Sequence, residues 1–199
     1  MTRIIAGSAG GRQIAVPPGR GTRPTSDRAR EAMFATVTSV RGTLRGAAVL
    51  DLFAGSGAVG LEALSRGAAD VLLIESDSRA ARVISENIAA LGLAGARLVC
   101  DRADRVLARG PGQQARRDFV FADPPYATSA DELAGILRAL AGQGWLAAGA
   151  LIAVERATRS GPPPWPAAYV PGRSRRYGEA TLWYGRAAGE NAAPAATGG

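Results

Sequence analysis

The chain of 199 residues contains no histidine, no lysine and a single cysteine, Cys100. These absences exclude zinc sites built from clustered cysteine and histidine, cysteine redox pairs and histidine-dependent catalytic triads. No run of about 18 apolar residues occurs, and the first residues lack the charged-then-apolar order of a secretion signal. We therefore expect a cytoplasmic protein that binds no metal. The length suits one domain with a short appendage, and we expect a monomer.

The charge is distributed unevenly along the chain. All 24 basic residues are arginine, and the formal net charge is +7. Residues 1–45 hold eight arginines against two acidic residues, and residues 156–199 hold six against two. The middle, 46–155, holds ten against thirteen. Two basic ends around a neutral-to-acidic middle favour a polyanion such as a nucleic acid as partner.

Apolar runs alternate with segments of helical periodicity through the middle of the chain. Strands are predicted at 47–52, 70–75, 96–100, 118–122 and 150–155, and helices at 26–40, 57–66, 78–91, 102–109 and 130–142. This alternation predicts an α/β fold with a parallel sheet covered by helices on both faces. Hairpins are predicted at 3–16 and 173–185, so the last strand should be antiparallel.

We expect three parts along the chain. A basic hairpin and loop extension covers 1–24, a single α/β domain covers 25–186, and a low-complexity, disordered tail covers 187–199.

A glycine-rich segment, DLFAGSGAVG at 51–60, ends one predicted strand and opens a helix. Its glycines allow a ligand to approach the backbone, and Glu75 at the end of the next strand suits a ribose diol. The pattern fits a dinucleotide or S-adenosylmethionine. Asp51 favours S-adenosylmethionine, because a carboxylate there repels a pyrophosphate and attracts an ammonium and a sulfonium. The predicted donor-site residues are Asp51, Phe53, Gly55, Ser56, Gly57 and Glu75.

A second motif, Asp123-Pro124-Pro125-Tyr126, directly follows an apolar strand. The prolines make the turn rigid and leave carbonyl groups as acceptors. The amino group of a base is a poor nucleophile, and it is activated when a carboxylate and a carbonyl each accept one of its N–H groups. Tyr126 can stack on the base. These four residues therefore predict methyl transfer to an exocyclic nitrogen.

The N-terminal part carries further motifs. It holds RIIAG from Arg3, then Gly11-Arg12, then TRPTSDRAREAMF from Thr22 to Phe34. Together with DLFAGSG, DPPY and the closing Tyr-Gly hairpin, this order resembles the bacterial small-subunit ribosomal RNA guanine-N2 methyltransferase family over roughly residues 3–185. The resemblance implies a Rossmann-like class I methyltransferase fold. That fold has a mostly parallel seven-stranded sheet with an antiparallel last strand, here with an N-terminal β-hairpin extension.

The resemblance also implies partners and roles. The substrate is a guanine of 16S ribosomal RNA in the small subunit or a late assembly intermediate, held at its amino group by Asp123 and Pro124. Thr25, with Asp27 and Arg28, lies over the methionine end of the donor or at the target entrance, and the donor adenine is read near Arg102 and Ala103 or by Asp101. Phosphate contacts are expected from the arginine-rich elements, namely Arg3, Arg12, Arg20, Arg23, Arg28, Arg173, Arg175 and Arg176.

Other functions remain open at this point. A DNA adenine-N6 methyltransferase would share both motifs, although it usually needs a separate recognition domain. A non-catalytic RNA-binding or ribosome-assembly module and a dinucleotide oxidoreductase are the further alternatives. Protein-glutamine methyltransferases are disfavoured, because they usually carry asparagine at the position of Asp123.

Overall fold

The computed structural model describes residues 1–18 and 27–188. The predicted donor residue Thr25 and the predicted phosphate contacts Arg20 and Arg23 lie outside these ranges.

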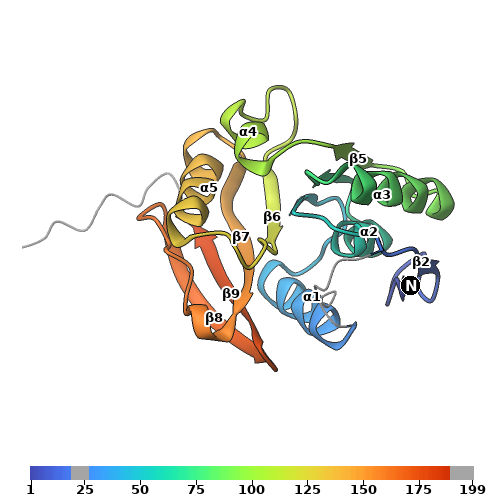
Figure 1. The fold of residues 1–199 in the computed structure, drawn as a ribbon, viewed down its shortest axis with the longest axis horizontal. Helices are drawn as coiled ribbons and strands as arrows, with labels where there is room; N and C mark the ends of the chain where they lie inside the picture. Colours follow the sequence, from blue (N-terminus) through green and yellow to red (C-terminus); the bar gives the residue numbers. More distant parts are fainter. Residues whose placement is uncertain (19–26, 189–199) are drawn as a thin grey trace, which may run out of the picture.

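A seven-stranded sheet forms the centre of the protein, in the order β5-β4-β3-β6-β7-β9-β8 (Figure 1). The strands are β3 (Ala48–Leu52), β4 (Asp70–Ile74), β5 (Ala96–Val99), β6 (Arg117–Ala122), β7 (Leu146–Ala157), β8 (Tyr169–Tyr177) and β9 (Ala180–Ala187). The first five are parallel to one another, and β9 is antiparallel to both β7 and β8. This confirms the predicted mostly parallel sheet with an antiparallel last strand, which is inserted between β7 and β8.

Helices cover both faces of the sheet, as predicted. They are α1 (Asp27–Arg41), α2 (Ala58–Ser65), α3 (Ser78–Leu91), α4 (Ala103–Ala108) and α5 (Ala130–Gly142), with a 3₁₀ turn, η1 (Thr158–Ser160). Local signals set several of the boundaries: the Asp77 side chain caps α3, Gly92 ends it in a left-handed conformation, and Ser129 with Glu132 forms a capping box on α5. No helix within 1–18 and 27–188 is long and apolar enough to cross a membrane.

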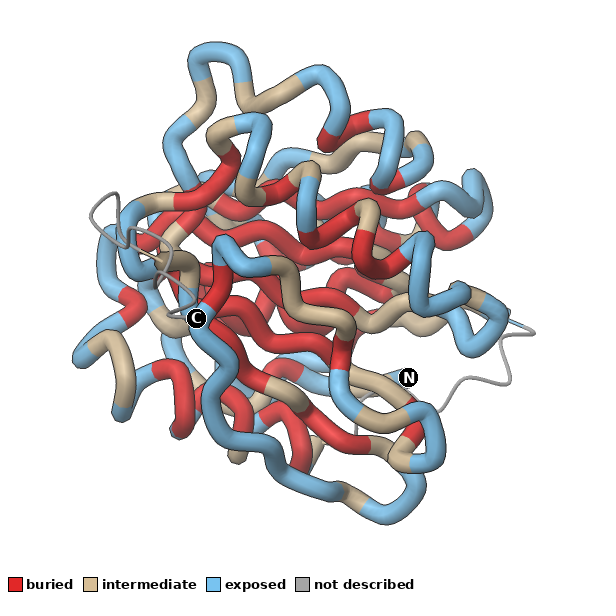
Figure 2. The backbone as a smooth tube through the Cα atoms, turned by 90° about the vertical axis from the view of Figure 1, so that its left-hand side faces the viewer, coloured by how far each residue is buried: buried red, intermediate tan, exposed pale blue. Residues whose placement is uncertain are grey.

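Two apolar clusters hold the layers together, one on each face. The first joins α1, α2 and α3 to the odd-numbered residues of the central strands, such as Val49 and Phe121. The second joins α4 and α5 to the even-numbered ones, such as Leu50 and Val120. Buried residues therefore follow the central strands, with exposed ones on the outer turns (Figure 2). Alternation of this kind is expected for a sheet packed on both sides.

The N-terminal hairpin consists of two strands of two residues each, β1 (Thr2–Arg3) and β2 (Gln13–Ile14). It does not stand apart from the domain. Ile4, Ala9 and Ile14 are buried in the first apolar cluster with α1 and α2. Removing their apolar surface from water is favourable in free energy, and this holds the hairpin on the domain.

Candidate active site

Strands β4, β3 and β6 end side by side at the carboxyl edge of the sheet, and β7 continues beside them to Ala157. The last residues that pair between these parallel strands, from β4 through β3 and β6 to β7, lie level with one another across the sheet. The next residue of each strand therefore forms a row along this edge, in the order Glu75, Phe53, Asp123 and Glu155. Ligands of open α/β sheets bind at this edge, outside the strand ends. The row brings both sequence motifs to one place.

The glycine-rich loop lies between β3 and α2, and its backbone is unusual at two points. Phe53 has a φ of 62°, the single positive value for a non-glycine residue among those the structure describes. Such strain tends to persist at functional sites. Gly55 also has a positive φ, and a Cβ built on it would meet little but the Phe53 carbonyl oxygen at 3.9 Å. The loop therefore offers bare backbone toward open space, as a donor molecule would need.

The other glycines of the loop serve packing. A Cβ on Gly60 would approach the Leu73 side chain to 2.9 Å, and one on Gly57 would approach it to 3.2 Å. Helix α2 thus lies closer to β4 than a larger residue would permit. Ser56, predicted as a donor residue, is buried beside them, and its carbonyl accepts a hydrogen bond from Asn87.

The carboxylates of Asp51 and Glu75 hold the glycine-rich loop and the start of α2 through hydrogen bonds to backbone N–H groups. Asp51 accepts from the Gly60 N–H at 2.8 Å, and Glu75 accepts from the Gly55 N–H at 2.8 Å and the Asp77 N–H at 2.9 Å. The pKa of Asp51 is raised to about 8, chiefly by burial and also by the nearby carboxylates of Asp123 and Glu75, which together outweigh the lowering by the hydrogen bond from the Gly60 N–H. A cation bound beside Asp51 would stabilise its ionised form.

The predicted adenine-reading segment follows β5, next to β4 on the same edge. Ala103 is buried at the start of α4, whereas the exposed Arg102 side chain pairs with Asp104 at 3.0 Å. That hydrogen bond raises the pKa of Arg102 and lowers that of Asp104. The Asp101 carboxylate accepts from the Arg102 N–H and pairs with Arg109. Backbone groups at Arg102 and Ala103, or the Asp101 carboxylate, remain the predicted adenine contacts.

The Asp123–Tyr126 turn leaves the edge of the sheet without further strand pairing. Asp123 and Pro124 are half-buried, Pro125 is exposed, and Tyr126 is 70% exposed. An exposed aromatic ring of this size beside a buried edge is a surface on which a base can stack. The turn borders a hollow whose walls include Thr128 and the end of β7.

The hollow contains residues that the sequence analysis did not single out. Glu155, Arg156 and Ser160 line it together with the turn. The Arg156 guanidinium donates to the carbonyls of Gly161 and Pro162, and burial lowers its pKa. Glu155 ends the predicted strand 150–155, as Glu75 ends the predicted strand 70–75, so a carboxylate at the end of a predicted strand was the available signal.

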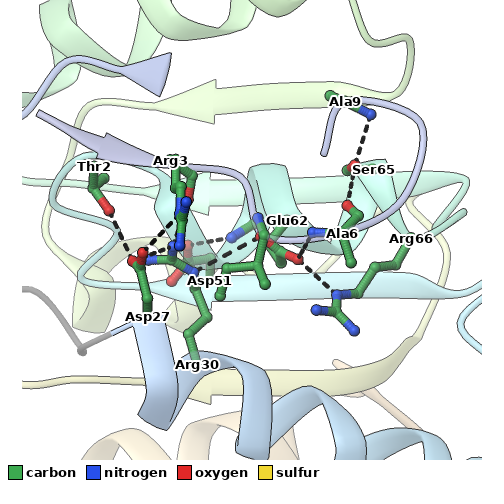
Figure 3. A network of polar contacts seen from close by, with 12 residues as sticks. Thr2, Arg3, Ala6, Ala9, Asp27, Arg30, Asp51, Glu62, Ser65 and Arg66 are labelled. Carbon is green, nitrogen blue, oxygen red and sulfur yellow. Dashed lines mark hydrogen bonds and ion pairs between the residues drawn. The ribbon is translucent and has the colours of Figure 1, made fainter. Parts of the chain in front are cut away.

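A polar network fixes the N-terminal hairpin beside α2 (Figure 3). The fully buried Glu62 carboxylate accepts from the Ile5 N–H at 2.6 Å and the Ala6 N–H at 3.0 Å. It also pairs with Arg66 at 2.7 Å and with the buried Arg30 at 3.8 Å. Sequence reasoning missed this network, because an internal helix glutamate is usually exposed.

The predicted phosphate contacts do not lie on one surface. Arg3 pairs with Asp27 at 3.2 Å, and Arg12 donates to the last carbonyls of α3, those of Ala90 and Leu91. The β8 arginines lie on the opposite side of the molecule from the hairpin (Figure 1). Four of the predicted contacts are exposed in the described structure without an ion pair to another described residue: Arg28, Arg173, Arg175 and Arg176.

Comparison with known proteins places this geometry in a family. Residues 2–186 match the family model described as conserved hypothetical protein 95. The chain is 39% identical to ribosomal RNA small subunit methyltransferase D of Escherichia coli K12, over 95% of this chain and 92% of that protein. It is 36% identical to the protein of the same name from Haemophilus influenzae, over 77% of each chain.

Solved structures agree. The Escherichia coli protein yhhF, which carries a provisional description as a methyltransferase, superposes with a TM-score of 0.81 at 36% identity and covers 94% of this chain and 97% of its own. At 12% identity, magnesium protoporphyrin IX methyltransferase of Synechocystis with bound S-adenosylmethionine shares the fold alone, with a TM-score of 0.62 over 81% of this chain and 79% of its own. The chain therefore belongs to the small-subunit ribosomal RNA methyltransferase D family of S-adenosylmethionine-dependent methyltransferases.

Proposed function

We propose that the protein transfers a methyl group from S-adenosylmethionine to the exocyclic N2 of a guanine in 16S ribosomal RNA. The observation that carries this proposal is the row at the carboxyl edge of the sheet. It sets Asp123 of the Asp-Pro-Pro-Tyr turn directly beside Phe53 and the glycine-rich loop. A group held by the turn is therefore one strand away from a molecule held by the loop, roughly 5 Å.

The residues of the edge fit the methyl donor. Bare backbone at Gly55 admits the ligand, Glu75 suits the ribose diol, and Asp51 suits the cationic end. When bound, S-adenosylmethionine supplies an electrophilic methyl group on a positively charged sulfur. At Gly55 the loop has no side chain that would occupy the position of the donor. The Asp51 carboxylate is held in its orientation by the hydrogen bond from the Gly60 N–H.

The turn performs the activation. The Asp123 carboxylate and the Pro124 carbonyl each accept one N–H of the amino group, which directs the nitrogen lone pair toward the donor and offsets the positive charge that develops. Tyr126 stacks on the base and keeps water from that face. The proton lost from nitrogen passes toward Asp123, the carboxylate nearest to it.

The substrate class rests on the family and on charge. Relatives named for the small ribosomal subunit cover nearly the whole chain. The exposed arginines of β8 suit a phosphate backbone. We propose the small subunit or a late assembly intermediate as the form that is bound, by a monomer in the cytoplasm, with Arg28, Arg173, Arg175 and Arg176 contacting phosphates.

The direct test is a nucleoside analysis. Small ribosomal subunits from a strain that lacks the gene are incubated with the protein and labelled donor, and the modified nucleosides are identified and mapped by mass spectrometry. We expect N2-methylguanosine at one position of 16S RNA. Methylated adenosine, or no transfer to RNA, would contradict the proposal.

The role of the turn is tested separately with Asp123→Ala. We expect methyl transfer to fall by at least about a hundredfold, as when one oriented charge-stabilising group is lost, with donor affinity within severalfold of the wild type. Asp131→Ala, which removes an exposed carboxylate on α5, serves as the control. Near-normal turnover of Asp123→Ala would show that the turn is only architectural.

A further inference from the structure

The hollow beside the Asp123–Tyr126 turn contains a second carboxylate that the proposed chemistry does not use. Glu155 lies in β7, one residue past the last position at which this strand pairs with β6, and is level with Asp123, the residue that follows β6. Odd-numbered residues of both strands, Phe121 and Ala153 among them, belong to the same apolar cluster. Asp123 and Glu155, the next odd-numbered positions, both line the hollow.

The spacing of the two strands that carry these carboxylates suits one edge of a base. Neighbouring strands lie about 4.8 Å apart, and the glutamate side chain is one methylene longer than the aspartate side chain. A base whose amino group is held at Asp123 and Pro124 would thus present the adjacent ring nitrogen to Glu155. The bases differ at that nitrogen. Guanine carries an N1–H donor next to its amino group, whereas adenine and cytosine carry an acceptor there.

We propose that Glu155 selects guanine by accepting the N1–H, an inference that rests on the proposed function. Asp123, the Pro124 carbonyl and Glu155 then supply three acceptors for the three N–H groups on this edge of guanine. With adenine or cytosine, the carboxylate faces the lone pair of a ring nitrogen in place of an N–H group, and this repulsion disfavours both bases. The hydroxyls of Thr128 and Ser160 also line the hollow and supply donors for the O6 of guanine.

The test measures base preference in addition to rate. Once the modified position is mapped, two sets of small subunits are prepared, with guanine or adenine at that position, and kcat/KM is measured on each. We expect Glu155→Gln to lower kcat/KM on guanine at least about tenfold. The guanine-to-adenine ratio should fall further, because the glutamine amide can donate to the adenine N1.

Further variants separate selection from folding. Glu155→Ala should lose activity on guanine without gaining activity on adenine. Glu86→Gln, on the exposed face of α3, should leave the activity on both bases unchanged. Donor affinity, measured by calorimetry, should be the same in all of them.

The outcomes distinguish the inference from the function beneath it. If the wild type modifies a base other than guanine, the proposed function fails and the inference fails with it. If the wild type forms N2-methylguanosine and Glu155→Gln keeps both its rate and its preference, the inference alone is overturned. Loss of donor binding in Glu155→Gln would also overturn it, because Glu155 would then belong to the donor site or to the core.

Discussion

The two ends of the chain are both rich in arginine, yet their guanidinium groups have different surroundings. In the N-terminal part, Arg12 hydrogen-bonds to the end of α3, and Arg30 is buried against Asp27 and Glu62. In the C-terminal part, Arg173 and Arg175 project from the exposed strand β8 and form no ion pair with any residue in 1–18 or 27–188. Equal charge density along a sequence therefore need not mean equal availability to a polyanion.

The difference follows from what surrounds each segment. The N-terminal hairpin carries apolar side chains that enter the first cluster, so its polar groups must find partners inside the protein. Strand β8 is an edge strand whose residues from 170 to 176 are exposed. Arginines on such an edge also prevent pairing with other chains, and this role is compatible with phosphate binding.

The largest expected effect comes from removing residues 1–16. This deletion exposes the cluster around Ile4 and Ile14 and leaves the buried Glu62 without its backbone donors. We expect a loss of more than about 5 kcal/mol, comparable with the whole stability of a domain, so that the truncated protein neither unfolds cooperatively nor binds donor. Calorimetric unfolding and donor titration measure both. A stable truncated protein with normal donor affinity would show that the hairpin is a separable arm.

A smaller loss is expected for Glu62→Ala. It removes one of the two carboxylates that face the buried Arg30, and it leaves the N–H groups of Ile5 and Ala6 without their acceptor; breaking a buried charged network of this kind typically costs about 3–5 kcal/mol. Urea unfolding measures the change, with Glu86→Ala on the surface of α3 as the matched control. A loss below about 0.5 kcal/mol would mean that the network in Figure 3 contributes little.

The β8 arginines should affect RNA binding and leave the fold intact. Replacing Arg173, Arg175 and Arg176 by serine should reduce the slope of log affinity against log salt by about one unit per residue. The free energy of unfolding should change by less than about 0.5 kcal/mol, since all three are exposed.

The control for this variant removes the same charge elsewhere. Serine at Arg79, Arg82 and Arg116, which are exposed on other surfaces, should leave the slope nearly unchanged. Binding of both triple variants to small subunits is measured over a range of salt concentrations. Equal slopes for the two variants would mean that β8 is not the phosphate-binding surface.

The smallest effect is expected for Arg12→Ala. This variant removes hydrogen bonds to the last carbonyls of α3 and should cost about 1 kcal/mol of stability. The salt slope of RNA binding should stay as in the wild type. A slope lowered by one unit without loss of stability would place Arg12 with the β8 arginines and remove the contrast between the two ends.

The sequence by itself determined the layered α/β fold and both motifs of the site. Strands buried on both faces appear as apolar runs, and turns that hold ligands at strand ends are short and local, so DLFAGSG and DPPY could be recognised without coordinates. The predicted helices 78–91 and 130–142 coincide with α3 and α5, whose first turns are fixed locally by the caps at Asp77 and Ser129.

Only the tertiary structure decided which distant residues meet. Glu155 lies beside Asp123 because β7 pairs with β6, and Glu62 holds a hairpin that is 56 residues away in sequence. Neither contact leaves a periodic or spacing signal in the chain. Strand order and buried polar pairs depend on how whole elements pack, and that packing is a property of the folded chain rather than of any local segment.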